Sequence, residues 1–223
     1  MSSQALRVGM LGGTFDPIHH GHLRSALEAR EALGLDRLHM IPAPKPPLRG
    51  EPQVSAEQRL TLLTLGIGET PGLYADDREL RRDGPSYSID TLIELRKEYG
   101  PQARLVMIIG FDAFLRLAQW HQAQALFDHA HLAVMARPGY AAPWPEELTE
   151  LVGAREVEGA DSLMQRPSGG VMMLTLPSQM AISATYIRKR LGEGKSTRYL
   201  LPEAVEEAIG KNGFYRHFSS HDE

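Results

Sequence analysis

The spacing of apolar positions along the chain predicts an α/β fold. Short runs rich in Val, Ile, Leu and Met alternate with longer segments in which apolar residues recur at helical spacing, the pattern expected of a parallel sheet flanked by helices. The predicted strands are residues 6–11, 37–41, 104–109, 131–136 and 171–174, and the predicted crossover helices are residues 22–33, 56–67 and 88–99. We therefore expect a Rossmann-like, open and mostly parallel sheet with helices on both faces.

The length of the chain favours a single domain. Its 223 residues, 42% of them hydrophobic, can bury one substantial core, so residues 1–223 are expected to form one unit. Residues 42–52 and 154–170 follow neither the helical nor the strand period. We interpret both stretches as surface loops within that domain.

Composition narrows the classes of partner. A net charge of −4 gives no positive field to attract nucleic acid or an anionic membrane, so any phosphate site must be built locally. The absence of cysteine excludes disulfides and thiolate chemistry. No long apolar run or signal peptide is recognisable, and we expect a cytoplasmic protein. The sequence leaves open whether the chain forms a homo-oligomer.

The segment Gly12-Gly13-Thr14-Phe15-Asp16-Pro17-Ile18-His19-His20-Gly21-His22 follows the first predicted strand and leads into the first predicted helix. Two glycines allow the backbone to approach a ligand closely, and free amides at a helix start favour phosphate. His19 and His22 can place two imidazoles on one side of a phosphoryl group. A simple tight turn and a zinc site are the alternatives, but the sequence offers no clear third zinc ligand.

A second polar cluster, Ile182-Ser183-Ala184-Thr185-Tyr186-Ile187-Arg188-Lys189-Arg190, follows the last predicted strand. Ser183 is a plausible N-cap, which places Thr185 in the first turn of a helix and Arg188 just beyond it. Such a helix start offers amides, hydroxyls and a guanidinium to an anion. Taken alone, a capped helix with three consecutive basic residues is more often a solvated face.

Together the two motifs resemble the nucleotidyltransferase superfamily, which is marked by H-x-G-H and I-S-x-T-x-I-R. The segment Ser86-Tyr87-Ser88-Ile89-Asp90-Thr91-Leu92 and Trp120 resemble, more narrowly, the bacterial nicotinate-nucleotide adenylyltransferases. The resemblance covers nearly the whole chain and includes Pro46-Pro47, residues 57–63, 108–112 and 137–139. It implies adenylyl transfer from ATP to nicotinate mononucleotide, giving nicotinate adenine dinucleotide and pyrophosphate in NAD biosynthesis, with Mg²⁺ arriving on ATP.

The resemblance and the needs of phosphoryl transfer together suggest the ATP contacts. The acceptor phosphate is itself the nucleophile, so positioning and charge stabilisation suffice. His19 and His22 are assigned to the phosphates, and Arg188 with Thr185 to the outer phosphates. Asp112 is expected either to accept the adenosine ribose hydroxyls or only to cap the helix that follows it. The complete expected ATP set adds Gly12, Gly13, Thr14, Phe15, Gly110, Ile182 and Ser183, with no protein-bound metal.

For the acceptor, the amides at Tyr87 and Ser88 are expected to take the nicotinate carboxylate, and Trp120 to stack on the pyridinium ring. Both aromatic residues could instead be packing residues. Lys45 and Arg49 complete the expected mononucleotide contacts.

The sequence departs from the family pattern at three places. Leu48 stands where the family commonly has a phosphate-contacting histidine, which puts the separate roles of Lys45 and Arg49 in doubt. Phe111 replaces a residue that is usually small beside the adenosine site, and Ala184 stands where serine is also common.

Two other functions compete with this interpretation. The same chemistry could serve another phosphate acceptor, such as nicotinamide mononucleotide or phosphopantetheine, which carboxylate recognition would discriminate. The chain could also be a non-catalytic nucleotide-binding regulator. The retention of His19, His22 and Arg188 together argues against a purely binding role.

Overall fold

The computed structural model describes residues 5–44, 54–136, 143–178 and 180–216 of the chain. The sheet has six strands in the order β3-β2-β1-β4-β5-β6 and is parallel throughout, the doubly wound order of Rossmann-like folds. The predicted α/β class is therefore confirmed. The strands are β1 (Arg7–Gly13), β2 (Arg37–Pro42), β3 (Leu73–Ala75), β4 (Arg104–Gly110), β5 (His131–Ala136) and β6 (Val171–Thr175).

The helices differ widely in length. Those of at least seven residues are α1 (His20–Ala32), α2 (Ala56–Ile67), α3 (Ser88–Tyr99), α6 (Glu146–Val152), α8 (Ala184–Gly192) and α9 (Glu203–Asn212). The short ones are α4 (Phe111–Phe114), α5 (Leu126–His129), α7 (Ala160–Leu163) and the 3₁₀ turns η1 (Leu117–Gln119), η2 (Ala123–Ala125) and η3 (Gly153–Arg155). None of the helices in the described ranges has the length and apolar character needed to cross a bilayer.

The contacts divide the chain into two compact units. Unit 1 comprises Met1–Leu11, Glu28–His39 and Ser86–Pro177, and unit 2 comprises Gly12–Leu27, Met40–Pro85 and Ser178–Glu223. The chain passes between them within β1, α1 and β2.

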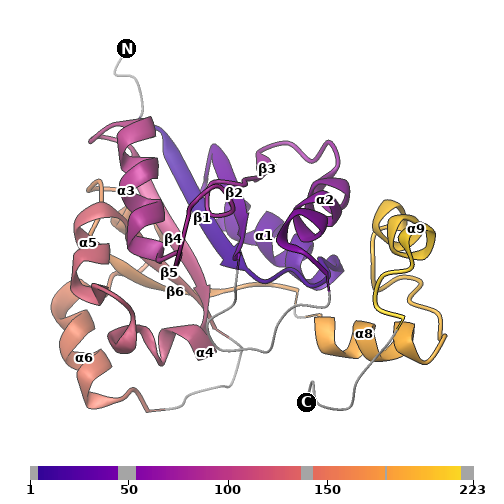
Figure 1. Cartoon of the computed structure of the whole chain (residues 1–223). Helices are drawn as coiled ribbons and strands as arrows, with labels where there is room; N and C mark the ends of the chain where they lie inside the picture. The colour runs from indigo at the N-terminus through magenta and orange to yellow at the C-terminus, as the bar shows by residue number, and fades with distance from the viewer. Residues whose placement is uncertain (1–4, 45–53, 137–142, 179, 217–223) are drawn as a thin grey trace. The chain divides into compact units, whose positions relative to one another are not determined.

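Unit 1 is built on paired parallel strands. Val106 of β4 pairs with His131 of β5, and Leu132 of β5 pairs with Val171 of β6. The residues of β4 from 105 to 109 are all buried, which explains why this strand reads as a continuous apolar run. Helices α3 and α5 pack against each other and against these strands (Figure 1).

Unit 2 carries both sequence motifs. Its helix α2 packs against β3 and α9, as Figure 1 shows. A capping box starts α2: the Ser55 hydroxyl accepts from the Gln58 amide at 3.2 Å, and the Gln58 side chain accepts from the Ser55 amide at 2.8 Å. The helix therefore begins at the predicted residue, Ala56.

Two short elements, β3 and α7, were not predicted from the sequence. The strand β3 was not predicted because it spans three residues, of which only Leu73 is buried, too few for an alternating pattern. The stretch 154–170, expected to be a surface loop, contains part of η3 and all of α7. Leu163 is buried there, but a four-residue helix is too short to display helical periodicity.

Candidate functional site

The turn from β1 into α1 holds two imidazoles face to face. The rings of His19 and His22 are stacked, with centroids 3.7 Å apart and planes 21° apart. The ring of Phe15 meets the His22 ring edge-on at 5.2 Å. Because Phe15 is itself buried, its side chain packs against the His22 ring and is not exposed to a ligand.

Two glycines of this turn are required by packing. A Cβ at Gly13 would lie 2.8 Å from the Phe15 ring, and one at Gly21 would lie 3.0 Å from His19 Nδ1. A side chain at either position would therefore displace an aromatic ring of the turn. Around Gly12 there is open space, which leaves its backbone accessible, as a phosphate contact would need.

The histidine at the start of the motif is neutral at pH 7 and has a defined tautomer. Burial lowers the pKa of His19 from 6.5 to about 4, with a smaller contribution from His20. Its Nδ1 accepts from the backbone N–H of His22 at 3.3 Å, so the remaining ring proton lies on Nε2. His19 thus offers one N–H donor without carrying charge.

This depressed pKa predicts a pH-dependent stability. Between pH 6.5 and about 4 the unfolded imidazole binds a proton that the folded one does not, so stability is lost as the pH falls through that window. Relative to His19→Gln, the wild type should lose about 3 kcal/mol more of its free energy of unfolding between pH 7 and pH 4, measured by urea titration. Identical pH slopes in the two proteins would show that the His19 proton is not excluded by folding.

The helix start differs from its prediction. Helix α1 begins at His20, two residues before the predicted start. The backbone N–H groups of His22 and Leu23 both bond to the His19 carbonyl, and that of His20 bonds to the Leu200 carbonyl. Two of the amides expected to face a phosphate, those of His22 and Leu23, are therefore occupied, and the imidazoles become the principal donors of this turn.

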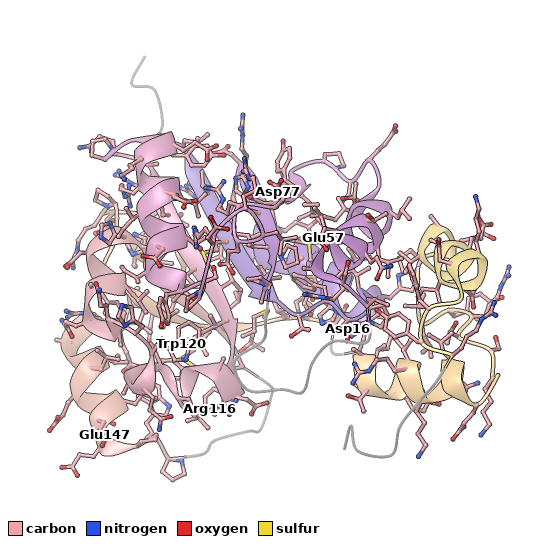
Figure 2. All side chains as sticks on the ribbon, in the orientation of Figure 1. Asp16, Glu57, Asp77, Arg116, Trp120 and Glu147 are labelled. Atoms are coloured by element: carbon pink, nitrogen blue, oxygen red, sulfur yellow. The ribbon has the colours of Figure 1, made fainter. Side chains whose placement is uncertain are left out.

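The second motif forms α8 as predicted, and its arginine contacts the first motif within unit 2. Ser183 caps the helix by accepting from the Tyr186 amide at 3.2 Å. Arg188 Nη1 donates to the carbonyl oxygen of Asp16 at 2.8 Å and lies 3.9 Å from its Oδ2. Arg188 Nη2 donates to Thr185 Oγ1 at 3.4 Å. Figure 2 shows Asp16 beside the start of α8.

The solvated-face interpretation of α8 is wrong for one of its three basic residues. The Arg188 side chain is only 12% exposed, whereas Lys189 is exposed. Arg190 lies over the Tyr186 ring at 5.6 Å and donates to the Ser196 carbonyl. Arg188 therefore faces the turn of the first motif, while its neighbours stay on the surface of the helix.

The fully buried Arg59 holds the turn between β1 and α1 through its guanidinium. Arg59 of α2 donates to the carbonyl of Thr14 at 2.6 Å, to that of Ala43 at 2.8 Å and to that of Pro44 at 3.1 Å. Burial lowers the pKa of Arg59, yet an arginine side chain remains protonated. Arg59 is not identifiable from the sequence, because one arginine in an amphipathic helix is normally expected on its solvent side.

The candidate acceptor residues lie in unit 1. Tyr87 is the N-cap residue of α3 and is exposed, and α3 begins at Ser88 as predicted. The Tyr87 ring stacks on His121, with centroids 4.2 Å apart. Trp120, directly before that histidine, is half-buried and follows η1 (Figure 2). His121 thus stacks on one predicted acceptor aromatic, Tyr87, and directly follows the other, Trp120, in the chain. His121 was not predicted as a site residue, although it adjoins Trp120.

The candidate adenosine residues also lie in unit 1, at the end of β4. Gly110 ends that strand as the N-cap residue of α4, with open space around its Cα. Asp112 lies exposed in the first turn of α4 and makes no cap hydrogen bond, so the capping alternative is wrong. Phe111 is buried near Phe114. In unit 2, the backbone N–H of Ile182 bonds to the Met180 carbonyl, which removes that donor from the expected adenine contacts.

Some predicted features fall outside the described residues: Lys45, Arg49, Leu48 and residues 137–139. Within the described part of the chain, no group of three or more His, Asp or Glu side chains has the arrangement of a metal site. The zinc alternative for the histidine motif therefore finds no ligand set there.

Comparison with known proteins identifies relatives along almost the full length. Residues 10–190 match the cytidylyltransferase-like family. The chain is 61% identical over 209 residues to a protein of Chromohalobacter salexigens named as a probable nicotinate-nucleotide adenylyltransferase, covering 94% of this chain and 95% of that one. It is 45% identical to a protein of the same name from Aeromonas salmonicida, covering 94% and 97%.

A solved structure has the same fold. The nicotinic acid mononucleotide adenylyltransferase of Plasmodium falciparum, complexed with NaAD, aligns with a TM-score of 0.69 at 14% identity and covers 96% of this chain and 98% of its own. At that identity the likeness concerns the fold alone.

Proposed function

Because the chain belongs to the cytidylyltransferase-like family, and within it to the nicotinate-nucleotide adenylyltransferases, we propose that it transfers the adenylyl group of ATP to nicotinate mononucleotide. The observation that carries this proposal is the contact of Arg188 with Asp16, which joins the two sequence motifs in unit 2. A guanidinium and two imidazoles near one turn form a donor set suited to a polyphosphate.

In the proposed reaction, a phosphate oxygen of nicotinate mononucleotide attacks the α-phosphorus of ATP. The bond from that phosphorus to the bridging oxygen breaks, and pyrophosphate leaves with the electron pair. His19, as a neutral Nε2–H donor, and His22 stabilise the charge on the α-phosphoryl oxygens and the leaving group. Arg188 and Thr185 hold the outer phosphates. No protein group has to accept a proton, because the attacking phosphate is already anionic.

Magnesium enters as part of the substrate, MgATP. The triphosphate supplies oxygen ligands and water completes the coordination, because Mg²⁺ seldom needs an all-protein cage. The buried carboxylate of the turn, Asp16, accepts a hydrogen bond from Tyr215 and faces Arg188. The turn is therefore built mainly to present donors to phosphate.

The acceptor contacts are proposed for unit 1. The amides at the start of α3, at Tyr87 and Ser88, are suited to the nicotinate carboxylate, and Trp120 to the pyridinium face. Asp112 would accept the adenosine ribose hydroxyls, and its exposure in the first turn of α4 supports this role. We propose that residues 1–223 act as one nucleotidyltransferase domain, which the shared six-stranded sheet supports.

The proposed function is tested with a panel of acceptors. The protein is incubated with MgATP and, separately, nicotinate mononucleotide, nicotinamide mononucleotide or phosphopantetheine, while pyrophosphate and the adenylylated product are quantified. Equimolar pyrophosphate and nicotinate adenine dinucleotide, with the highest kcat/KM for the acid, are expected. A higher kcat/KM for either other acceptor would reassign the substrate, and no product with any acceptor would favour a nucleotide-binding regulator.

Replacing Trp120 with alanine is expected to raise the KM for nicotinate mononucleotide by about tenfold, because loss of a ring over the pyridinium face removes about 1 to 2 kcal/mol of binding. The KM for ATP should change by less than about twofold. Steady-state kinetics with each substrate varied in turn measures both constants. The matched control is Trp144→Ala, at a tryptophan whose ring meets the Phe114 ring with centroids 4.9 Å apart. An unchanged KM for nicotinate mononucleotide in Trp120→Ala would remove Trp120 from the acceptor site.

A further inference from the structure

A buried hydrogen bond joins the end of the described chain to its first motif. The Tyr215 hydroxyl donates to Asp16 Oδ1 at 2.7 Å, across 199 positions of sequence. Tyr215 is 4% exposed and Asp16 is 5% exposed. Neither residue has a direct role in the proposed transfer, so that reaction does not explain why this hydrogen bond is present.

Asp16 lies between Tyr215 and Arg188, the arginine proposed to hold the outer phosphates. Its Oδ1 accepts from Tyr215, its Oδ2 lies 3.9 Å from Arg188 Nη1, and its carbonyl oxygen accepts from the same Nη1 at 2.8 Å. Both the side chain and the backbone of Asp16 therefore restrict where the guanidinium can lie. The orientation of the carboxylate in turn depends on the Tyr215 hydroxyl.

The tyrosine is a hydrogen-bond donor under ordinary conditions. Burial, together with the neighbouring Asp16 carboxylate, raises the pKa of Tyr215 well above its usual value. The phenol consequently keeps its proton, and its hydroxyl is the donor in the hydrogen bond to the carboxylate oxygen. A hydrogen bond to a charged acceptor is stronger than one between neutral groups.

The backbone on both sides of this bond adopts an unusual conformation. Phe15, directly before Asp16, has a φ of 48°, and Tyr215 has a φ of 61°. Non-glycine residues adopt the left-handed region at a cost in free energy and remain there only when their surroundings hold them. The chain accepts this cost at Tyr215 itself and at the residue before Asp16, which indicates that the geometry of this hydrogen bond matters.

We propose that Tyr215 is a positioning residue for the phosphate site: through Asp16 it holds the Arg188 guanidinium in the orientation in which it meets the triphosphate. The effect on turnover rests on the proposed adenylyl transfer, whereas the effect on Arg188 itself does not. Tyr215→Phe isolates this role, because it removes one hydroxyl and keeps the buried ring.

The direct test is NMR of the arginine guanidinium groups in the ligand-free protein. In the wild type, Arg188 should show hindered rotation of its guanidinium; in Tyr215→Phe, that rotation should be at least about tenfold faster. Arg96 is the internal reference, because its guanidinium donates to the carbonyls of Gly100, Ala103 and Pro167 in unit 1. An unchanged Arg188 alongside an unchanged Arg96 would overturn the proposal.

A second variant keeps the test decisive if Tyr215→Phe does not fold. Asp16→Asn keeps an oxygen that can accept from Tyr215 but removes the charge that faces Arg188. Faster rotation of Arg188 is again expected. Unchanged rotation would show that the Asp16 carboxylate does not restrict the guanidinium, and would refute a positioning role that Tyr215 exerts through it.

The kinetic test is a double-mutant cycle. Tyr215→Phe should lower kcat by about tenfold, or 1.4 kcal/mol of activation free energy, with less than about a twofold change in the KM for nicotinate mononucleotide. In an Arg188→Lys background the same substitution should change kcat by less than about twofold, since its target is already lost. Tyr199→Phe, at a tyrosine that is 84% exposed in the same unit, should match the wild type.

The outcomes separate the two proposals. A tenfold loss in both backgrounds would show that Tyr215 acts independently of Arg188. A wild-type protein that adenylylates no acceptor would defeat the proposed function, while the NMR measurement would still decide whether Tyr215 positions Arg188.

Discussion

Replacing His22 with alanine is expected to lower kcat by about 100- to 1,000-fold, while the KM for nicotinate mononucleotide changes by less than about threefold. The His22 imidazole is held between the His19 ring and the edge of Phe15, so its donor is already oriented before substrate binds. A donor of this kind contributes mainly to stabilising charge that develops in the transition state. Steady-state kinetics at saturating MgATP separates the two constants.

The matched control for this substitution is His20→Ala. His20 occupies the variable position of H-x-G-H, and it lines a groove together with Leu23 and Arg24. Its removal should change kcat by less than about threefold. Equal losses in kcat and in mononucleotide binding for His22→Ala would contradict the assignment of His22 to the transition state.

Replacing Arg188 with alanine is expected to have two consequences, because the arginine has two partners. Loss of the guanidinium from the outer phosphates should lower kcat by about 1,000-fold and raise the KM for ATP. Loss of the cation beside the buried Asp16 carboxylate should also lower the free energy of unfolding by about 2 to 4 kcal/mol. Kinetics and urea titration measure these effects independently.

Lys189→Ala supplies the control for Arg188, because Lys189 is the exposed neighbour on the same helix. It should leave both kcat and stability near the wild-type values. If Arg188→Ala lost stability but kept its turnover, Arg188 would be a structural partner of Asp16 and not a phosphate ligand.

The elements that the sequence predicted best are those whose ends have local signals. Helices α2 and α3 begin and end at the predicted residues; Ser55 supplies a cap for α2, and a glycine follows each helix. Helix α1 starts earlier than predicted because His19, an uncommon capping residue, provides both the carbonyl and the ring nitrogen at its start. Elements of three or four residues carry no readable period, so β3 and α7 were missed.

The residues of the candidate site also differ in whether a local sequence pattern marks them. The histidines and Arg188 could be found because they occur in compact motifs, and the structure brings Arg188 to the first motif at Asp16. Tyr215 could not be found, because its partner lies 199 positions away and a pairing at that distance leaves no pattern in one sequence. Arg59 was missed for a related reason: its three acceptors are backbone carbonyls, and any residue type can supply a carbonyl.

The supporting residues explain why this site uses so few charged groups. His19 is neutral, the Asp16 carboxylate faces the Arg188 guanidinium, and Arg59 donates to backbone carbonyls. A phosphate site can therefore be built in a chain whose net charge is −4, because local orientation of donors replaces a general positive field.

The most direct test of the account is a crystal structure of the protein with Mg²⁺ and an ATP analogue whose bridge between the α- and β-phosphates cannot be cleaved. We expect the triphosphate to lie within hydrogen-bonding distance of the imidazoles of His19 and His22 and of the Arg188 guanidinium. A triphosphate bound away from this turn, with Arg188 still engaged only by Asp16 and Thr185, would contradict it.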